Sequence, residues 1–347
     1  MLKDLKIVEL ASVLAGPAVG MFFAEMGCTV TKVESRKAGD ITRRWKLPTE
    51  SSEAPISAYY SSVNWNKEVL RLDYLNAEDF ETLRSYLQEA DVVITNFKHG
   101  DGEKFGLTYA HLIEINPKLI VGEINGFGPD SPRAAFDVVL QAETGFISMS
   151  GHPDGDPVKM PVALIDVLAA HQLKEGLLVA LLNQKRPQRV TVSLYEAALA
   201  SLVNQATNFL MEEHVPQPMG TLHPNIAPYG DLFYSSDNLP LVLAVGNNKQ
   251  FESLLKVLSI EPLPSLASNE LRVKNRAELQ AVLQEKIGTW KREDFFKSCL
   301  KHSIPMGRVL NLKEVFEQPE AQSLVLEENR EGVKTRRVKT TVFNSEF

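Results

Sequence analysis

The first half of the chain alternates short apolar runs with longer amphipathic segments. Apolar runs with the length of buried strands occupy residues 6–10, 29–34, 91–95 and 119–123. Between them, residues 13–26, 77–89 and 107–116 have helical periodicity. Strands that alternate with helices bury both faces of one sheet. The pattern therefore predicts an α/β fold built on an open, doubly wound and mostly parallel sheet.

The second half has a different texture. Residues 166–183 are apolar around most of a helical circumference, which predicts a buried helix, and a strand at 190–193 and a second long helix at 194–211 follow. A loop rich in Pro and Gly then leads to a strand at 239–245 and to helices at 251–258, 277–287 and 291–302. We therefore expect a large Rossmann-like domain over 1–213, a smaller α+β domain over 214–325, and a segment over 326–347 that returns towards the large domain.

Composition and charge limit the possible partners. The 347 residues carry a net charge of −7, which argues against general binding to nucleic acid or to an anionic membrane surface. The two cysteines, Cys28 and Cys299, have no metal-ligand spacing and read as buried thiols, so no metal is expected. The N-terminus does not resemble a signal peptide, and no uncharged run reaches the roughly 18 apolar residues of a membrane span. The expected location is the cytoplasm.

Asp166 is the candidate for covalent chemistry. It lies at the boundary between an apolar run at 162–165, which reads as a strand, and the buried helix. One interpretation is a helix N-cap, a position that aspartate favours. The other is a carboxylate nucleophile, kept ionised and in place by the helix N-terminus. The two interpretations are compatible.

Two segments are candidates for binding phosphate. The turn at 13–17 joins the first strand to the first helix, although it could equally be a plain loop. A basic cluster follows the second strand and reads either as a phosphate site or as a solvated surface; it comprises Arg36, Lys37, Arg43 and Arg44. Lys98 and Lys104 follow a later strand at the same predicted edge of the sheet.

Several motifs in the right order resemble one family, the class III coenzyme A transferases. The resemblance rests on Val13-Leu14-Ala15-Gly16-Pro17, Gly39-Asp40-Ile41-Thr42-Arg43, Asn64-Trp65-Asn66-Lys67 with Leu72-Asp73, Asp91-Val92-Val93 with Asn96-Phe97, Phe136-Asp137 with Gln141-Ala142, His223-Pro224, Ala227-Pro228-Tyr229, Ala244-Val245-Gly246-Asn247, and Ile304-Pro305. Two positions depart from the family pattern. Ser35 stands where an arginine is frequent, with Arg36 beside it, and Lys104 stands where arginine is usual.

The resemblance implies a mechanism and a binding site. It places the nucleophile on Asp166, with acyl-CoA and a carboxylic acid as substrates and no metal. It implies a coenzyme A site in the large domain, built from Val13, Leu14, Ala15, Leu72, Asn96, Phe97 and Lys104, with Arg36 and Asp137 beside them. It also implies a homodimer of two ring-shaped chains threaded through each other, a rare topology.

Two alternatives share this fold. A 2-methylacyl-CoA racemase needs bases for proton exchange, and family racemases carry His-Asp where this chain has Phe136-Asp137. They also carry a glutamate where this chain has Asn247, Asn248 and Lys249. A CoA-binding member without catalytic activity is the second alternative. The motifs favour the transferase.

Overall fold

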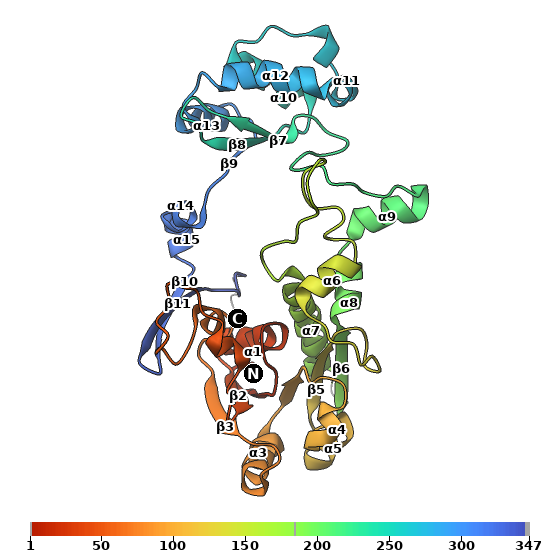
Figure 1. Ribbon diagram of the computed structural model, residues 1–347, viewed down its shortest axis with the longest axis vertical. Helices are drawn as coiled ribbons and strands as arrows, with labels where there is room; N and C mark the ends of the chain where they lie inside the picture. The colour runs from red at the N-terminus through yellow and green to blue at the C-terminus, as the bar shows by residue number, and fades with distance from the viewer. Residues whose placement is uncertain (1, 184, 344–347) are drawn as a thin grey trace. The chain divides into compact units, whose positions relative to one another are not determined.

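The computed structural model describes residues 2–183 and 185–343 (Figure 1). The chain forms two compact units, each with its own core. The first contains the residues up to Ile147, Lys159–Pro216, and the chain from Ser323 onward. The second contains Ser148–Val158 and Gln217–Gln322.

A six-stranded sheet forms the centre of the first unit. Its strands are β1 (Lys6–Glu9), β2 (Thr29–Ser35), β3 (Glu68–Leu72), β4 (Val92–Thr95), β5 (Ile120–Asn125) and β6 (Gln188–Ser193). They are ordered β3-β2-β1-β4-β5-β6, and every neighbouring pair is parallel. This is the doubly wound order, so the predicted fold class is confirmed. Of these six strands, β3 is the one that sequence reasoning did not predict.

Helices cover both faces of this sheet. The first unit contains α1 (Ala15–Glu25), α2 (Ala58–Ser61), α3 (Ala77–Glu89), α4 (Asp101–Phe105), α5 (Tyr109–Ile115), α6 (Asp137–Glu143), α7 (Leu164–Leu182), α8 (Leu194–Ala200) and α9 (Val203–Glu212), with short 3₁₀ turns at Leu2–Asp4 and Ile41–Arg44. Alternate residues of one strand point to opposite cores. Ile7 packs with α1 and α7, whereas Val8 packs with α3 and α5.

The predicted long helix over 194–211 is wrong in one respect. The chain leaves helical geometry after Ala200 and resumes it at Val203, whose φ is +46°. A β-branched residue at positive φ is strained, and the break turns α9 away from the axis of α8.

The end of the chain completes the first unit. β10 (Val325–Arg330) and β11 (Val333–Val338) form an antiparallel hairpin. Next to it, the buried carboxylate of Glu25 in α1 pairs with Arg337 and accepts hydrogen bonds from the backbone amides of Thr340 (3.0 Å) and Thr341 (2.6 Å). These contacts fix the returning segment to α1.

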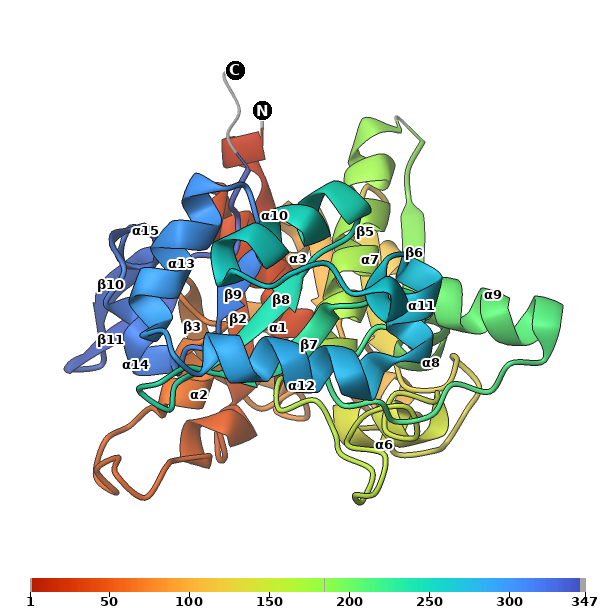
Figure 2. The same ribbon diagram turned by 90° about the horizontal axis from the view of Figure 1, so that it is seen from above.

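The second unit has an antiparallel sheet of β7 (Tyr229–Tyr234), β8 (Pro240–Ala244) and β9 (Met306–Arg308). Its helices are α10 (Asn248–Leu258), α11 (Asn269–Lys274), α12 (Arg276–Ile287), α13 (Arg292–Lys301), α14 (Leu312–Phe316) and α15 (Pro319–Gln322), with a 3₁₀ turn at Pro264–Leu266. Figure 2 shows α10, α12 and α13 around the strands, and they share one apolar core. The predicted α+β character is confirmed. Residues 214–228 contain no helix or strand.

Candidate active site

Asp166 lies in the first turn of α7, as its third residue. The expected N-cap role is wrong, because the N-cap is Ala163, which has no side chain that could accept a hydrogen bond. The expected strand at 162–165 is also absent, since Leu164 and Ile165 already belong to the helix. The apolar run before Asp166 is therefore partly the buried start of the helix itself.

Asp137, from the start of α6, supplies the cap that α7 lacks. Its Oδ1 accepts hydrogen bonds from the backbone amides of Ile165 (2.7 Å) and Asp166 (3.4 Å). Its Oδ2 accepts one from Nε2 of Gln141 (2.5 Å), one helical turn later. The buried Gln141 in turn accepts a hydrogen bond from the backbone amide of Met160 (2.8 Å). The Asp137–Gln141 pair thus holds the entry to α7 and the orientation of Asp166.

The carboxyl group of Asp166 is held in an unusual protonation state. Only 9% of the residue is exposed, and burial, followed by the nearby charge of Asp137, raises its pKa to about 7. Burial and the charge of Asp137 therefore oppose the ionisation that the helix N-terminus was expected to favour. The amides of the first turn do favour an anion, but desolvation and a second carboxylate outweigh them.

The turn at 13–15 joins β1 to α1 and is strained. Val13 has a φ of +72°, which is rare for a β-branched residue and frequent at functional sites. Its amide donates to Oδ2 of Asp40 (3.3 Å). The side chain of Asn96 contacts both the amide (2.9 Å) and the carbonyl (2.7 Å) of Ser12. Asn96 and Asp40 therefore fix the conformation of this turn, although Val13, Leu14 and Ala15 line neither of the cavities described below.

Four charged groups, buried from solvent, lie beneath this turn. Nζ of Lys32 lies 3.0 Å from both Glu9 and Asp40, and Nζ of Lys67 lies 2.7 Å from the other oxygen of Glu9. Lys67 also donates to the carbonyl of Pro17 (2.8 Å). Two cations and two carboxylates balance in charge, yet burial lowers the pKa of Lys67 to about 7. Sequence reasoning matched Lys67 to a motif but gave it no role.

A cavity of about 220 Å³ opens at the carboxyl ends of β1, β2 and β4. In a doubly wound sheet this is where ligands usually bind. Asn96 and Phe97 line it together with Ser12, Lys98 and Tyr74. The ring of Phe97 packs edge to face with those of Tyr74 (6.3 Å between centroids) and Phe105 (5.9 Å). The cavity therefore combines an aromatic wall with polar groups.

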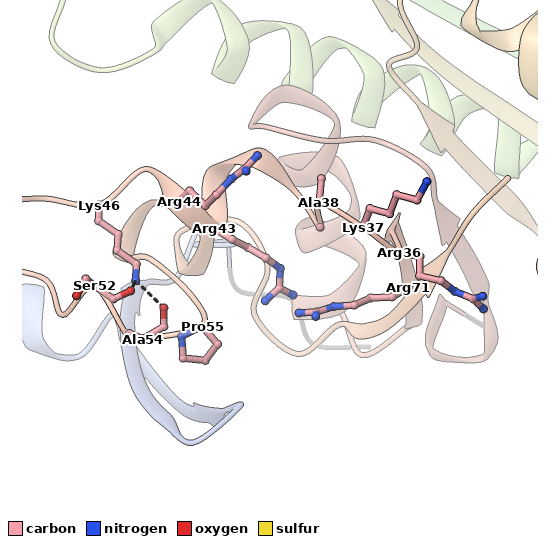
Figure 3. Close-up of a pocket in the computed structure, with 11 residues that line it drawn as sticks. Arg36, Lys37, Ala38, Arg43, Arg44, Lys46, Ser52, Ala54, Pro55 and Arg71 are labelled. Carbon is pink, nitrogen blue, oxygen red and sulfur yellow. Dashed lines mark hydrogen bonds between the residues drawn. The ribbon is translucent and has the colours of Figure 1, made fainter. Parts of the chain in front are cut away.

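The remaining predicted residues lie around this edge of the sheet. Leu72 is buried at the end of β3, and its carbonyl accepts from the amide of Arg36 (3.0 Å). The Arg36 side chain pairs with Asp79 and lines a second, basic cavity (Figure 3). Lys104 is exposed on α4, with Nζ 5.1 Å from the centroid of the Phe105 ring, and lines neither cavity.

Tyr59 is a residue that sequence reasoning missed. Burial, followed by the charges of Asp166, Asp137 and Asp40, raises the pKa of its phenol to about 12. The phenol therefore shares one region of the first unit with the two aspartates of α6 and α7 and with the aspartate that holds the β1–α1 turn. Its ring packs edge to face on Trp45 at 5.0 Å. Tyr59 belongs to the short helix α2, which the sequence pattern did not predict.

The described part of the chain contains neither a group of metal-ligating side chains nor a helix that could span a membrane. Across residues 2–183 and 185–343, no three His, Cys, Asp or Glu side chains are grouped as a metal site would need. Over the same residues, none of the helices combines the length and the apolar character that crossing a bilayer requires. Both cysteines are buried, as predicted.

Comparisons with known proteins bear on the family to which this chain belongs. A family model described as CoA-transferase family III matches residues 2–346. The succinate–glutarate CoA-transferase of Agrobacterium fabrum is 34% identical, over 99% of this chain and 90% of that protein. The human succinyl-CoA:glutarate CoA-transferase is 31% identical, over 94% of this chain and 76% of that protein. A crystal structure of a CaiB/BaiF family protein from Brucella suis matches with a TM-score of 0.88 and 36% identity, over 99% of this chain and 93% of that one.

Proposed function

Since the chain belongs to CoA-transferase family III, we propose that it moves coenzyme A from an acyl-CoA to a carboxylic acid through a covalent intermediate on Asp166. The observation that carries this proposal is the buried carboxyl group of Asp166 in the first turn of α7, with its backbone amide held by Asp137. A nucleophile needs a fixed orientation and a shell that excludes water, and this arrangement supplies both.

The reaction proceeds by exchange of acyl bonds. The ionised Asp166 attacks the thioester carbonyl of the donor, which forms a mixed anhydride and releases the CoA thiolate. The thiolate attacks the aspartyl carbonyl, so the donor acid leaves and an aspartyl-CoA thioester forms. The acceptor carboxylate then attacks this thioester and gives a second anhydride and the thiolate. Attack of the thiolate on the acceptor carbonyl yields the new acyl-CoA and restores the carboxylate of Asp166.

The raised pKa of Asp166 suits this chemistry. A carboxylate whose pKa is about 7 is more basic than an ordinary aspartate, and it is still ionised in a substantial fraction at neutral pH. Asp137 contributes in two ways. It orients the first turn of α7 through hydrogen bonds, and its charge raises the pKa of Asp166.

We place coenzyme A along the edge of the sheet where β1, β2 and β4 end. The strained turn of Val13, Leu14 and Ala15, held by Asn96, offers backbone groups to the ligand. Phe97 supplies an aromatic wall, while Arg36 and Lys104 add positive charge and Leu72 packs beneath. Every one of these residues belongs to the first unit.

For the acids, we propose dicarboxylates of four or five carbons. The support is that the Agrobacterium fabrum and human relatives are named for succinate and glutarate. Family relatives named as CoA-transferases also favour transfer over racemisation. The racemase alternative predicts rapid deuterium incorporation at the α-carbon of an acyl-CoA in D₂O, and such exchange without transfer would overturn our choice.

The direct test is to trap the intermediate. Incubation with succinyl-CoA and hydroxylamine should give a hydroxamate on Asp166, detected by peptide mass spectrometry. Asp166→Asn should abolish both the hydroxamate and the transfer to glutarate, while Asp130→Asn, an exposed aspartate on a loop, should leave both intact. Undiminished transfer by Asp166→Asn would refute the covalent role. A folded protein that binds CoA but transfers nothing would support the inactive alternative.

We further propose that the active form is a homodimer. Exposed apolar side chains gather at the end of α9, where Leu210 is 78% and Met211 72% exposed, and at the end of α7, where Leu182 is 84% exposed. Apolar exposure on this scale is typical of an interface. Sedimentation equilibrium should give twice the monomer mass. The threading of the two chains stays a prediction.

A further inference from the structure

The first unit has a second cavity, and all the charged residues that line it are arginine or lysine. It has a volume of about 320 Å³ and lies beside the strand-end cavity, with Gly39 lining both. Figure 3 shows its side chains, which come from the segment after β2, from the loop at 52–55 and from β3. Its six cationic residues are Arg36, Lys37, Arg43, Arg44, Lys46 and Arg71. None of the described residues that line it is acidic.

Three of these cations are matched by carboxylates outside the lining. Arg43 pairs with Glu34 (2.6 Å) and, together with Arg71 (3.5 Å), with Glu331 from the C-terminal hairpin. Figure 3 shows the guanidinium groups of Arg43 and Arg71 directed towards each other. Arg36 pairs with Asp79 in α3. These ion pairs fix the positions of three guanidinium groups around the cavity.

The other three cations have no carboxylate partner within the described residues. Nζ of Lys46 donates hydrogen bonds to the neutral carbonyl groups of Ser51, Ser52 and Ala54 (2.6–2.8 Å). Lys37 and Arg44 are exposed, and their charges face no described carboxylate within 4.0 Å. In a protein with a net charge of −7, this local excess of positive charge costs electrostatic energy unless an anion joins it.

The backbone also leaves room for a ligand. Gly39 has a φ of +64°, and a Cβ there would lie 3.0 Å from Cδ of Arg43. A larger residue would therefore press against both Arg43 and Glu34, in the wall that the two cavities have in common. Oxygen-rich anions bind tightly where guanidinium groups are held in place, where further ammonium and guanidinium groups are unpaired, and where the backbone leaves room.

From these observations we infer that the basic cavity is an anion site that takes a small molecule with more than one phosphate charge. A single phosphate would leave most of a cavity of 320 Å³ empty, and one monoanion would leave part of the positive charge unmatched. The phosphate groups have two possible sources. One is a free phosphorylated metabolite. The other is the 3′-phosphate of coenzyme A reaching in from the strand-end cavity, and that source rests on the proposed function.

Calorimetric titration of the full chain with inorganic pyrophosphate tests the inference. Wild-type protein should bind it with an affinity that weakens as KCl is raised. The double variant Lys37→Gln/Arg44→Gln should weaken binding by about a hundredfold, roughly tenfold for each lost charge. Arg84→Gln removes an exposed arginine of α3 outside the cavity and should change nothing. Asp166→Asn should bind pyrophosphate normally, which separates this inference from the proposed catalysis.

Two further arms distinguish the sources. If pyrophosphate still binds when the protein is saturated with coenzyme A, the site serves a free metabolite. If coenzyme A displaces it and dephospho-CoA does not, the site holds the 3′-phosphate. The inference is overturned if wild-type protein binds no pyrophosphate and the double variant distinguishes coenzyme A from dephospho-CoA as well as wild type does.

Discussion

Replacing Asp166 by Asn should stabilise the protein above neutral pH. Burial and the charge of Asp137 raise the pKa of the carboxyl group from 3.8 to about 7, so its ionisation opposes folding. At about 1.36 kcal/mol for each pKa unit, the full penalty is roughly 4 kcal/mol. An amide of the same shape carries no charge, so it avoids this penalty. It can also donate a hydrogen bond towards Asp137.

The pH dependence has a defined sign. Below the unfolded pKa of 3.8 the carboxyl group is protonated in both states and contributes nothing. Between 3.8 and about 7 the unfolded chain releases the proton and the folded protein retains it, so wild-type stability falls as pH rises. Above about 7 the penalty is complete and constant. The advantage of Asp166→Asn should therefore grow over this window and then level off.

Urea unfolding at a series of pH values from about 4 to about 9 measures this difference. The tryptophan fluorescence of Trp45 and Trp65 reports on the first unit. Asp130→Asn, which removes an exposed carboxylate, is the matched control and should not follow the same curve. A difference between Asp166→Asn and wild type that is independent of pH, or an Asn variant less stable at about pH 8, would refute the reasoning from burial.

The remaining predictions concern residues around this site. Asp137→Asn keeps an oxygen that can accept hydrogen bonds from the amides of α7 but loses the negative charge, so the pKa of Asp166 should fall. The acid limb of the pH profile of kcat/KM should therefore move to lower pH. An unchanged acid limb would contradict the electrostatic coupling between the two aspartates. Gly20→Ala would place a Cβ 1.9 Å from Oε2 of Glu9, which should lower the free energy of unfolding by about 1–3 kcal/mol, measured in urea. Glu25→Gln leaves a buried arginine without its anion, which should cost about 3–5 kcal/mol and speed limited proteolysis after β11; cleavage at the wild-type rate would show that this carboxylate does not anchor the segment.

The parallel sheet was predictable because its strands are buried on both faces. A strand such as Val92–Thr95 is fully buried, so it appears in the sequence as an unbroken apolar run. β3 lies at the edge of the sheet and reads Glu-Val-Leu-Arg-Leu, with only Leu72 buried. Its half-polar sequence carried no such signal. The break between α8 and α9 was missed for a similar reason, because Ser201 and Leu202 are neither glycine nor proline.

The position of Asp166 was predictable, whereas its protonation state was not. The aspartate before an apolar helix is visible in the sequence, and the resemblance to a family gave it a role. Its pKa depends on Asp137, which lies 29 positions earlier, and on burial by the first unit. Neither of these causes is local, so the spacing around Asp166 suggested an ionised cap, whereas the folded chain buries this carboxyl group beside a second carboxylate and raises its pKa.

The two aspartates also explain why the site is built from two helices. If Asp166 capped its own helix, its carboxylate would be committed to backbone amides and would be a weak nucleophile. By taking over those amides, Asp137 leaves the carboxyl group of Asp166 without a backbone donor and raises its basicity. The raised pKa of Asp166 also destabilises the folded protein above neutral pH, because the buried carboxyl group is then ionised. Activity should therefore rise around the folded pKa of about 7, which is the pH at which the stability gain of Asp166→Asn levels off.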